Sequence, residues 1–485
     1  MAGRVRGVTS LTGGLPGATA LGALALAVGL FVAPDPAAAQ SLEEALAKAY
    51  RDNPTLQARR ARLRAVDERV PQALSGWRPE VQLFGNYGGL RTRQNFDPRR
   101  DTRTTYSLEL EIRQNLYNGG GTEAQIAAAE ADVLAERARL RAQEQTVLFD
   151  TVTAYMDVVR DQAVLDLNTQ NERRLIRQLE ATRDRFEVGE VTRTDVAQAE
   201  SRLSRATSDR IRATGNLEVS RAIYERVVGV PPGELNQPLG LVELPTSRTE
   251  AIELAVGGNP DVTATVYDRR SALREIDSQF ADLLPDLDLV GSASHDRKTT
   301  TSDSERNQLS LTAQLTVPIY QQGVESSEIR EAKQRAREAL DAIEEARRGA
   351  TEDATSAWET YRTSLAEIEA IREEVRAAEI ALEGVEQEAT VGQRTVLDVL
   401  DAEQELLDAR VSLVEAERDL LVARYDLLVA VGSMSARDLG LDVQVYDPFA
   451  HYNSVRDRLW GAGDPAESSA YDTDRETVVI PGVQE

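Results

Sequence analysis

Two short segments of nearly the same sequence hold the side chains best placed for chemistry: VGEVTRTDV at 188–196 and VGQRTVLDV at 391–399. Asp398 and Asp401 are three residues apart, which stacks two carboxylates on one helix face, and Arg394 precedes them. Paired carboxylates occur in hydrolases, but no nucleophile, histidine or oxyanion glycine motif accompanies these. We therefore predict that the protein is not an enzyme.

Both segments also contain the pattern of a helix–helix turn: a glycine, a threonine three residues later, and an aspartate three residues after that (Gly189, Thr192 and Asp195; Gly392, Thr395 and Asp398). The glycine suits the left-handed end of one helix. The threonine and aspartate resemble a capping box for the next helix, with Asp in the place of Glu. Asp195 is explained equally well as a cap alone. Asp401 lies a turn further on, too late to cap.

The rare residue types exclude several kinds of site. The chain of 485 residues has no cysteine, which excludes disulfides, thiolate metal sites and a lipid-modified cysteine. Its two histidines, His295 and His451, are far apart in sequence. We therefore predict no metal and no cofactor. The net charge of −25 argues against binding nucleic acid, since phosphates would be repelled.

The first residues have the pattern of a secretory signal peptide. Arg4 and Arg6 precede the apolar run LGALALAVGLFVA, and the small residues at 37–39 offer a cleavage site before Gln40. An uncleaved anchor is the alternative. No later segment reaches the 18 to 20 apolar residues of a membrane helix, so strands would have to make any contact with a bilayer.

The chain is a tandem duplication. Asn53-Pro54 and Asn259-Pro260 coincide at an offset of 206, and LYNGG at 116–120 matches IYQQG at 319–323 at an offset of 203. We place the first repeat at 40–240, the second at 241–435, and a C-terminal segment with a polar, disordered tail at 436–485. In each repeat the sequence predicts, in order, short helices, a strand pair, a long helix and a return helix. These span 42–75, 79–117, 122–188 and 193–228 in the first repeat, and 250–284, 285–320, 324–391 and 396–431 in the second.

The two long helices predict a tube. A run of 68 residues would be about 100 Å long, far beyond a globular helix, so a coiled-coil-like assembly is implied. The short helices and the return helix, stacked end to end, would match that length and make an even wall. The turn segments then become hairpin tips far from the strands.

The strands predict an oligomer. Tyr106, Leu108, Leu110 and Ile112 alternate with polar residues, which predicts one apolar face. Four strands cannot close a barrel, and an open sheet edge cannot face lipid. Two chains would supply eight strands and three would supply twelve; the larger number leaves an open lumen.

These features together resemble the TolC family of outer membrane factors. The resemblance rests on the paired repeats, the LYNGG and PIYQQG joints, the two tip segments and DVQVYDPFAHYNSVRDRLWG in the C-terminal segment. It implies a mixed α and β membrane protein: a trimeric, twelve-stranded transmembrane β-barrel continuous with an α-helical barrel across the periplasm. Its function would be an exit duct in the bacterial outer membrane for type I secretion, multidrug efflux or both. Its partners would be outer membrane lipid, a periplasmic adaptor (membrane fusion protein) and an inner-membrane ABC or RND transporter.

The resemblance also assigns roles at the tips. Asp398 and Asp401 resemble the acidic rings of a periplasmic gate, and Arg394 resembles the arginine that ties neighbouring coiled coils, with Thr194 and Asp195 as its partners. The adaptor would dock on the tip residues (Val188, Gly189, Thr192, Val391, Gly392 and Thr395). Ala389 departs from the family, since some members carry a tyrosine in this closing network. Crowding of the carboxylates also predicts raised pKa values.

Two other readings remain open: a periplasmic coiled-coil adaptor and a scaffold protein without a pore. An adaptor predicts a single helical hairpin between β-rich halves. A soluble scaffold leaves the alternating strands and the duplicated strand-to-helix joints unexplained.

Overall fold

The computed structural model describes residues 40–94, 97–237, 243–301 and 303–463, and for 92–101 it describes no side chains. The residues from Ala39 onward form one unit. The predicted signal peptide (1–39) and the end of the C-terminal tail (464–485) lie outside the described residues. Within the described residues, none of the helices combines the length and apolar character that a membrane span needs.

Each repeat opens with short helices joined at an Asn-Pro pair. They are α1 (Leu42–Asp52), α2 (Pro54–Asp67) and α3 (Arg69–Leu74), then η1 (Ser75–Trp77), and in the second repeat α6 (Arg248–Gly258) and α7 (Pro260–Ala281). Asn53 accepts hydrogen bonds from the backbone of Thr55 and Leu56, at 2.9 and 3.4 Å, and proline takes the first position of α2. Asn259 caps α7 in the same way. The asparagine therefore ends one helix and begins the next.

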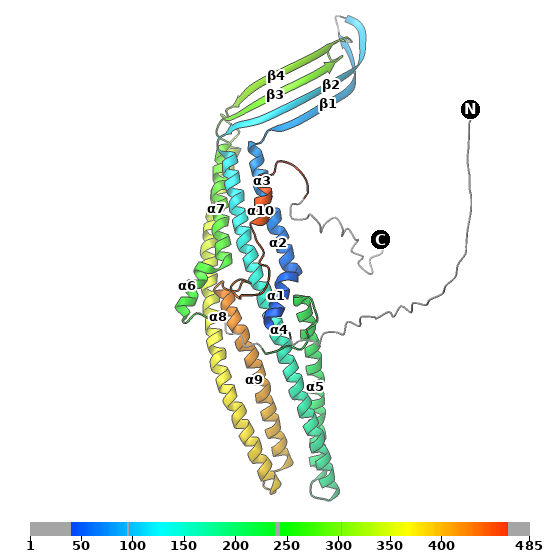
Figure 1. Ribbon diagram of the computed structural model, residues 1–485, viewed down its shortest axis with the longest axis vertical. Coiled ribbons are helices and arrows are strands. Elements are labelled where there is room, and N and C mark those ends of the chain that lie inside the picture. Colours follow the sequence, from blue (N-terminus) through cyan, green and yellow to red (C-terminus); the bar gives the residue numbers. More distant parts are fainter. Residues whose placement is uncertain (1–39, 95–96, 238–242, 302, 464–485) are drawn as a thin grey trace, which may run out of the picture. The chain divides into compact units, whose positions relative to one another are not determined.

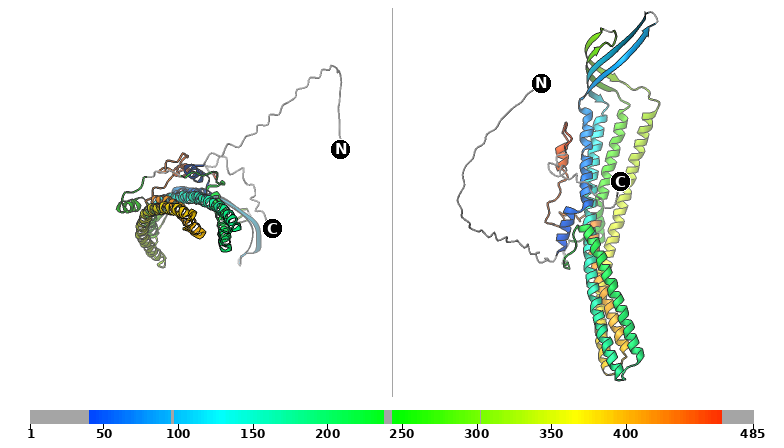
Figure 2. Two further views of the ribbon diagram at one scale, coloured as in Figure 1. Left: turned by 90° about the horizontal axis from the view of Figure 1, so that it is seen from below. Right: turned by 90° about the vertical axis from the view of Figure 1, so that its right-hand side faces the viewer.

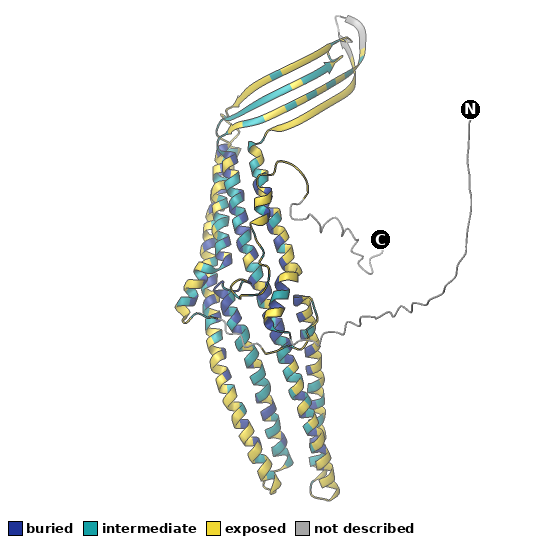
Figure 3. Cartoon of the chain, viewed as in Figure 1, coloured by how far each residue is buried: buried dark blue, intermediate teal, exposed yellow. Residues whose placement is uncertain are grey.

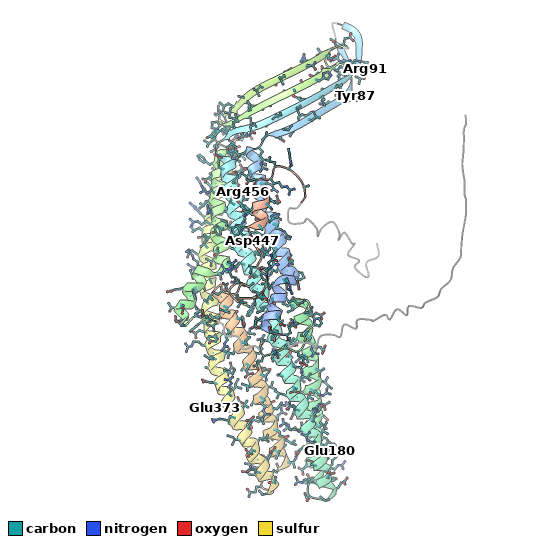
Figure 4. The ribbon with its side chains drawn as sticks, in the orientation of Figure 1. Tyr87, Arg91, Glu180, Glu373, Asp447 and Arg456 are labelled. Atoms are coloured by element: carbon teal, nitrogen blue, oxygen red, sulfur yellow. The ribbon has the colours of Figure 1, made fainter. Side chains whose placement is uncertain are left out.

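Four antiparallel strands form one sheet in the order β1-β2-β3-β4 (Glu80–Gln94, Asp97–Asn118, Asp286–Arg297 and Glu305–Thr316). The polar residues at 91–104 favour a loop between the first two strands by composition, but this expectation is wrong. Pairing of β1 with β2 continues to Gln94 and Asp97, past a bulge between Thr92 and Gln94. Each further residue pair satisfies backbone hydrogen-bonding groups that a loop would leave to water. The hairpin therefore extends beyond the residues that alternate between apolar and polar. Tyr87 and Arg91 lie toward its far end (Figure 4).

The register separates an apolar face of the sheet from a polar one. Cross-strand rows run through Val81, Ile112, Gly291 and Leu311, and through Leu83, Leu110, Ala293 and Leu309. The adjacent row consists of polar side chains (Gln82, Glu111, Ser292 and Ser310). Leu309 is 85% exposed in the single chain, so the apolar face has no cover within this chain (Figure 3).

Two helices of 67 residues follow the strand pairs: α4 (Gly121–Glu187) and α8 (Val324–Thr390). They begin after Gly120 and Gly323, which hold left-handed conformations with φ of 86° and 84°. The return helices α5 (Arg193–Val228) and α9 (Val396–Ala430) pack against α4 and α8. Figure 1 shows α1–α3 stacked beyond the end of α5 along α4, which is the even wall that the helix lengths predicted.

The largest core lies midway along the helices. Tyr155 of α4 and Tyr224 of α5 are fully buried, and the Tyr155 hydroxyl lies within hydrogen-bond distance of two carbonyl oxygens, that of Asn236 at 2.7 Å and that of Gln40 at 2.9 Å. The C-terminal segment packs here and contains α10 (Ala450–Val455), where buried His451 lies 3.1 Å from Asp67. Within this unit the long helices follow an arc, with α10 on the convex side (Figure 2).

Candidate gate at the hairpin tips

Both hairpin tips end in a complete capping box. The Asp195 carboxylate accepts from the Thr192 backbone at 2.7 Å and from its hydroxyl at 2.8 Å, and the Asp195 amide donates to that hydroxyl at 3.3 Å. Asp398 and Thr395 repeat this arrangement at 2.8, 2.8 and 3.2 Å. The four residues begin α5 and α9 as the sequence predicted.

The same contacts set the charge of the two caps. Hydrogen bonds from the Thr395 backbone and hydroxyl lower the pKa of Asp398, and Arg394 lowers it further. Hydrogen bonds from Thr192 lower the pKa of Asp195. The raised pKa values expected from crowding concern Asp398 and Asp401 of several copies brought together, and they stay a prediction. Donors aimed at a carboxylate stabilise its charged form.

Arg394 lies at the tip of the second hairpin and pairs within it. Its guanidinium donates to Glu388 of α8 at 2.7 Å, across the turn that holds Gly392. Ala389, next to Glu388, provides only a methyl group. Thr194 occupies the first turn of α5, beside Asp195. The structure thus places Arg394 on one hairpin and Thr194 and Asp195 on the other.

A different ion pair joins the two hairpins. Arg202 of α5 donates to Asp401 of α9, one turn above the capping boxes. Leu400, only 2% exposed, packs beside it against Leu175 of α4 and Ala206 of α5. Asp401 therefore contributes to a contact between the repeats, beside the apolar contact that Leu400 makes.

A second acidic group lies between the hairpins above this contact. Burial raises the pKa of Glu403 on α9, while the nearby guanidinium groups of Arg174 and Arg177 on α4 oppose that rise. Arg202, Leu400 and the Glu403 surroundings were missed from the sequence. A survey of charged residues within two turns of each tip would have found Arg202 and Glu403 but not their partners, because the partners lie about 200 residues away; Leu400 carries no such signal.

The outer surface of each tip is small and apolar. Val188 and Val391 are 72% and 70% exposed, and Gly189 and Gly392 hold φ angles of 81° and 79°. No atom lies within 4 Å of a side chain built on either glycine, so the left-handed backbone alone requires glycine there. Both tips therefore expose the same dipeptide, a valine followed by a glycine. Over the described residues, no cluster of three His, Cys, Asp or Glu suits a metal ion.

Comparison with known proteins gives the family. The model of the outer membrane efflux protein family matches residues 45–229 and 251–433, one match for each repeat. The outer membrane efflux protein BepC of Brucella suis is 36% identical over 433 residues, which cover 88% of this chain and 93% of BepC. The outer membrane protein TolC of Vibrio cholerae is 28% identical over 411 residues, which cover 83% of this chain and 92% of TolC.

A solved structure agrees with the fold. The outer membrane channel CmeC of Campylobacter jejuni superposes with a TM-score of 0.74 at 16% identity, covering 86% of this chain and 89% of CmeC. The tandem repeats, the fold class and the resemblance stated from the sequence are confirmed, and the pore-less adaptor or scaffold is not favoured. The chain therefore belongs to the outer membrane efflux protein family, and it is an outer membrane channel.

Proposed function

We propose that this channel works as a homotrimer that is closed at its hairpin tips and opened there by a periplasmic adaptor and an inner-membrane transporter. The observation that carries the gate is the contact of Arg202 with Asp401, which joins the first hairpin to the second near the entrance. Separation of the hairpins breaks this contact, so it favours the closed state.

The sheet supports the trimer. β1 and β4 each have one edge without a partner in the single chain. Three copies supply twelve strands that close on one another, which satisfies both edges and turns the uncovered apolar face to lipid. The strands β3 and β4 have 12 residues each. At about 3.3 Å per residue and a tilt of about 45°, that length matches a hydrocarbon core of about 30 Å.

The tips supply selectivity and docking. In a trimer, Asp398 and Asp401 form two rings of three carboxylates, which favour cations in a narrow opening. Arg394 is placed to bond Thr194 and Asp195 of a neighbouring hairpin when it releases Glu388. The valine–glycine steps at Val188 and Val391 present exposed apolar side chains and open backbone, which suits an adaptor that packs small residues against them.

The test is the conductance of single channels in planar bilayers. Arg202→Ala and Asp401→Asn each remove the inter-hairpin ion pair. The trimer contains three copies of the half-exposed Arg202–Asp401 pair, each stabilising the closed state by about 0.5 kcal/mol. Their loss removes roughly 1.5 kcal/mol, so the open population should rise about tenfold. The double variant should match the single variants, because the same contact is lost.

Arg212→Ala is the matched control. Arg212 also lies on α5 and pairs at 3.0 Å with Asp209 of the same helix, so it joins no hairpins. Its loss should leave the conductance unchanged. Equal effects of Arg202→Ala and Arg212→Ala, or no effect of either, would remove the gate assignment. Loss of cation selectivity in Asp398→Asn, which leaves the Arg202–Asp401 pair in place, tests the carboxylate rings separately.

A further inference from the structure

The described part of the C-terminal segment ends in two uncovered apolar side chains. Leu459 and Trp460 are 70% and 87% exposed, while Val455, one turn earlier in α10, is 1% exposed. Tryptophan is seldom left this open to water, because burial of so large an apolar side chain is strongly favourable. Among the residues that the structure describes, none covers this pair.

The pair lies where the helices meet the sheet. Arg78, two residues before β1, donates to the Arg458 carbonyl at 2.8 Å. This bond holds the residues after α10 beside the helix-to-strand joint that contains Trp77. Figure 1 shows the chain after α10 looping beside α3, at the end where β1 begins, and Figure 4 places Arg456 at the level of α3.

A local turn fixes how the two side chains are presented. The Arg458 guanidinium donates to the carbonyls of Trp460 at 3.2 Å and Gly463 at 2.5 Å. Gly461 has a φ of 106°, and a side chain there would lie 2.9 Å from the Arg458 guanidinium. Arg458 is thereby folded into the turn, and Leu459 and Trp460 are left on its surface.

The surroundings at this level have the pattern of a bilayer interface. The apolar face of the sheet begins at Val81, which is 61% exposed. Just after β4, Ile319 and Tyr320 are also uncovered. Tryptophan and tyrosine favour the boundary between acyl chains and headgroups, because their rings are apolar and their N–H or O–H groups reach water.

We propose that Leu459 and Trp460 insert into the periplasmic leaflet of the outer membrane, at the boundary of acyl chains and phospholipid headgroups. The C-terminal segment then connects the middle of the helical tube to the lipid surface through α10. This inference rests on the proposed orientation of the apolar sheet face toward lipid. Its partner is a phospholipid surface, and contact with another protein is an outcome that the test separates.

Fluorescence quenching in vesicles tests the insertion. The chain has three tryptophans, so Trp77→Phe with Trp358→Phe leaves Trp460 as the only one. The variant is reconstituted in phosphatidylcholine vesicles with bromines near the headgroup or deep in the acyl chains. Trp460 should lose most of its emission to the shallow bromines and much less to the deep ones, and aqueous iodide should quench it weakly.

The matched control keeps Trp358 alone, by Trp77→Phe and Trp460→Phe. Trp358 lies within α8 and packs against Tyr361, so neither brominated lipid should quench it. Strong quenching of Trp460 by iodide overturns the proposal in favour of a water-exposed turn. Protection from both iodide and bromines overturns it in favour of a protein contact.

Channel conductance of the same vesicles keeps the two proposals separate. Vesicles that conduct while Trp460 is unquenched by lipid refute the anchor and leave the channel intact. For this measurement the variant also carries Arg202→Ala, which favours the open gate, so vesicles without any conductance refute the proposed closed sheet itself. Gly461→Ala should weaken the shallow quenching while conductance persists, because the turn that presents Trp460 is displaced; unchanged quenching would show that the turn is not needed.

Discussion

Two carboxylates that look alike in the sequence, Asp398 and Asp401, have different surroundings. Asp398 accepts two hydrogen bonds from Thr395 and has a lowered pKa. Asp401 is held by a guanidinium from the other repeat, Arg202. The first is therefore bound to its own helix in any state of the gate, while the second changes its partner when the hairpins separate.

The lowered pKa of Asp398 predicts a pH dependence. A carboxyl whose folded pKa lies below its unfolded value of about 3.9 stays charged above that pH, and its charge is lost only as pH falls through the lower folded value. Cation selectivity that depends on Asp398 should therefore decline at a lower pH than it would with an ordinary aspartate. Reversal potentials across a salt gradient, measured as pH is lowered, check this.

Thr395→Val sharpens that experiment. It removes the hydroxyl donor but keeps the backbone donor, so the pKa of Asp398 should move up toward its ordinary value and selectivity should decline at higher pH. Loss of the cap also costs the α9 end about 1 kcal/mol. Thr351→Val, whose hydroxyl bonds Arg347 in the middle of α8, is the control. A decline at the same pH in all three proteins would contradict the assignment.

Some contacts at the hairpin tips could be predicted from the sequence and others could not. The caps were predictable because Thr-x-x-Asp is a local pattern whose partners lie within four residues. The pairing of Arg202 with Asp401 was not, because it depends on how two helices from different repeats pack. The preference of Arg394 for Glu388 in the single chain likewise depends on the geometry of the turn.

At the scale of elements, two equivalent glycines end the return helices in different surroundings. Gly229 and Gly432 are 203 residues apart and both hold positive φ angles, of 88° and 77°. A side chain on Gly229 would meet no atom within 4 Å, whereas one on Gly432 would lie 2.4 Å from the Gly258 carbonyl oxygen. The end of α9 thus packs backbone to backbone against the end of α6.

This pair predicts unequal costs for the same substitution. Gly229→Ala should cost about 1 kcal/mol, from the left-handed conformation alone. Gly432→Ala carries that cost and about 1–3 kcal/mol more, because the backbone of α6 must move. The temperature at which the oligomer dissociates on gels compares them. Equal dissociation temperatures would show that the α6–α9 contact does not limit stability.

The elements were predictable to different degrees. The long helices lack proline and begin and end at glycines, so their limits follow from local rules. The strand alternation was equally local. The extension of the first hairpin through 91–104 was not predictable, because polar residues there pair through their backbones, and that pairing leaves no period in the side chains.

At the scale of the whole molecule, the unpaired edges of β1 and β4 predict a defined oligomer. The protein purified from the outer membrane should be a trimer by light scattering in detergent. It should run as a trimer on an unheated gel and as a monomer after boiling. A soluble monomer or dimer in the periplasmic fraction would contradict the closed sheet and restore the scaffold interpretation.

The equal lengths of α4 and α8 have a consequence for the cell envelope. Since each helix has 67 residues and rises about 1.5 Å per residue, the chain carries a molecular ruler of about 100 Å. Removal of one heptad from every arm of both hairpins would shorten that ruler by about 10 Å while it preserves the helix faces. The adaptor would then have to bridge a wider gap. The number of residues in α4 and α8, between a glycine at the sheet and a glycine at the tip, thus sets how far the channel reaches from one membrane toward the other.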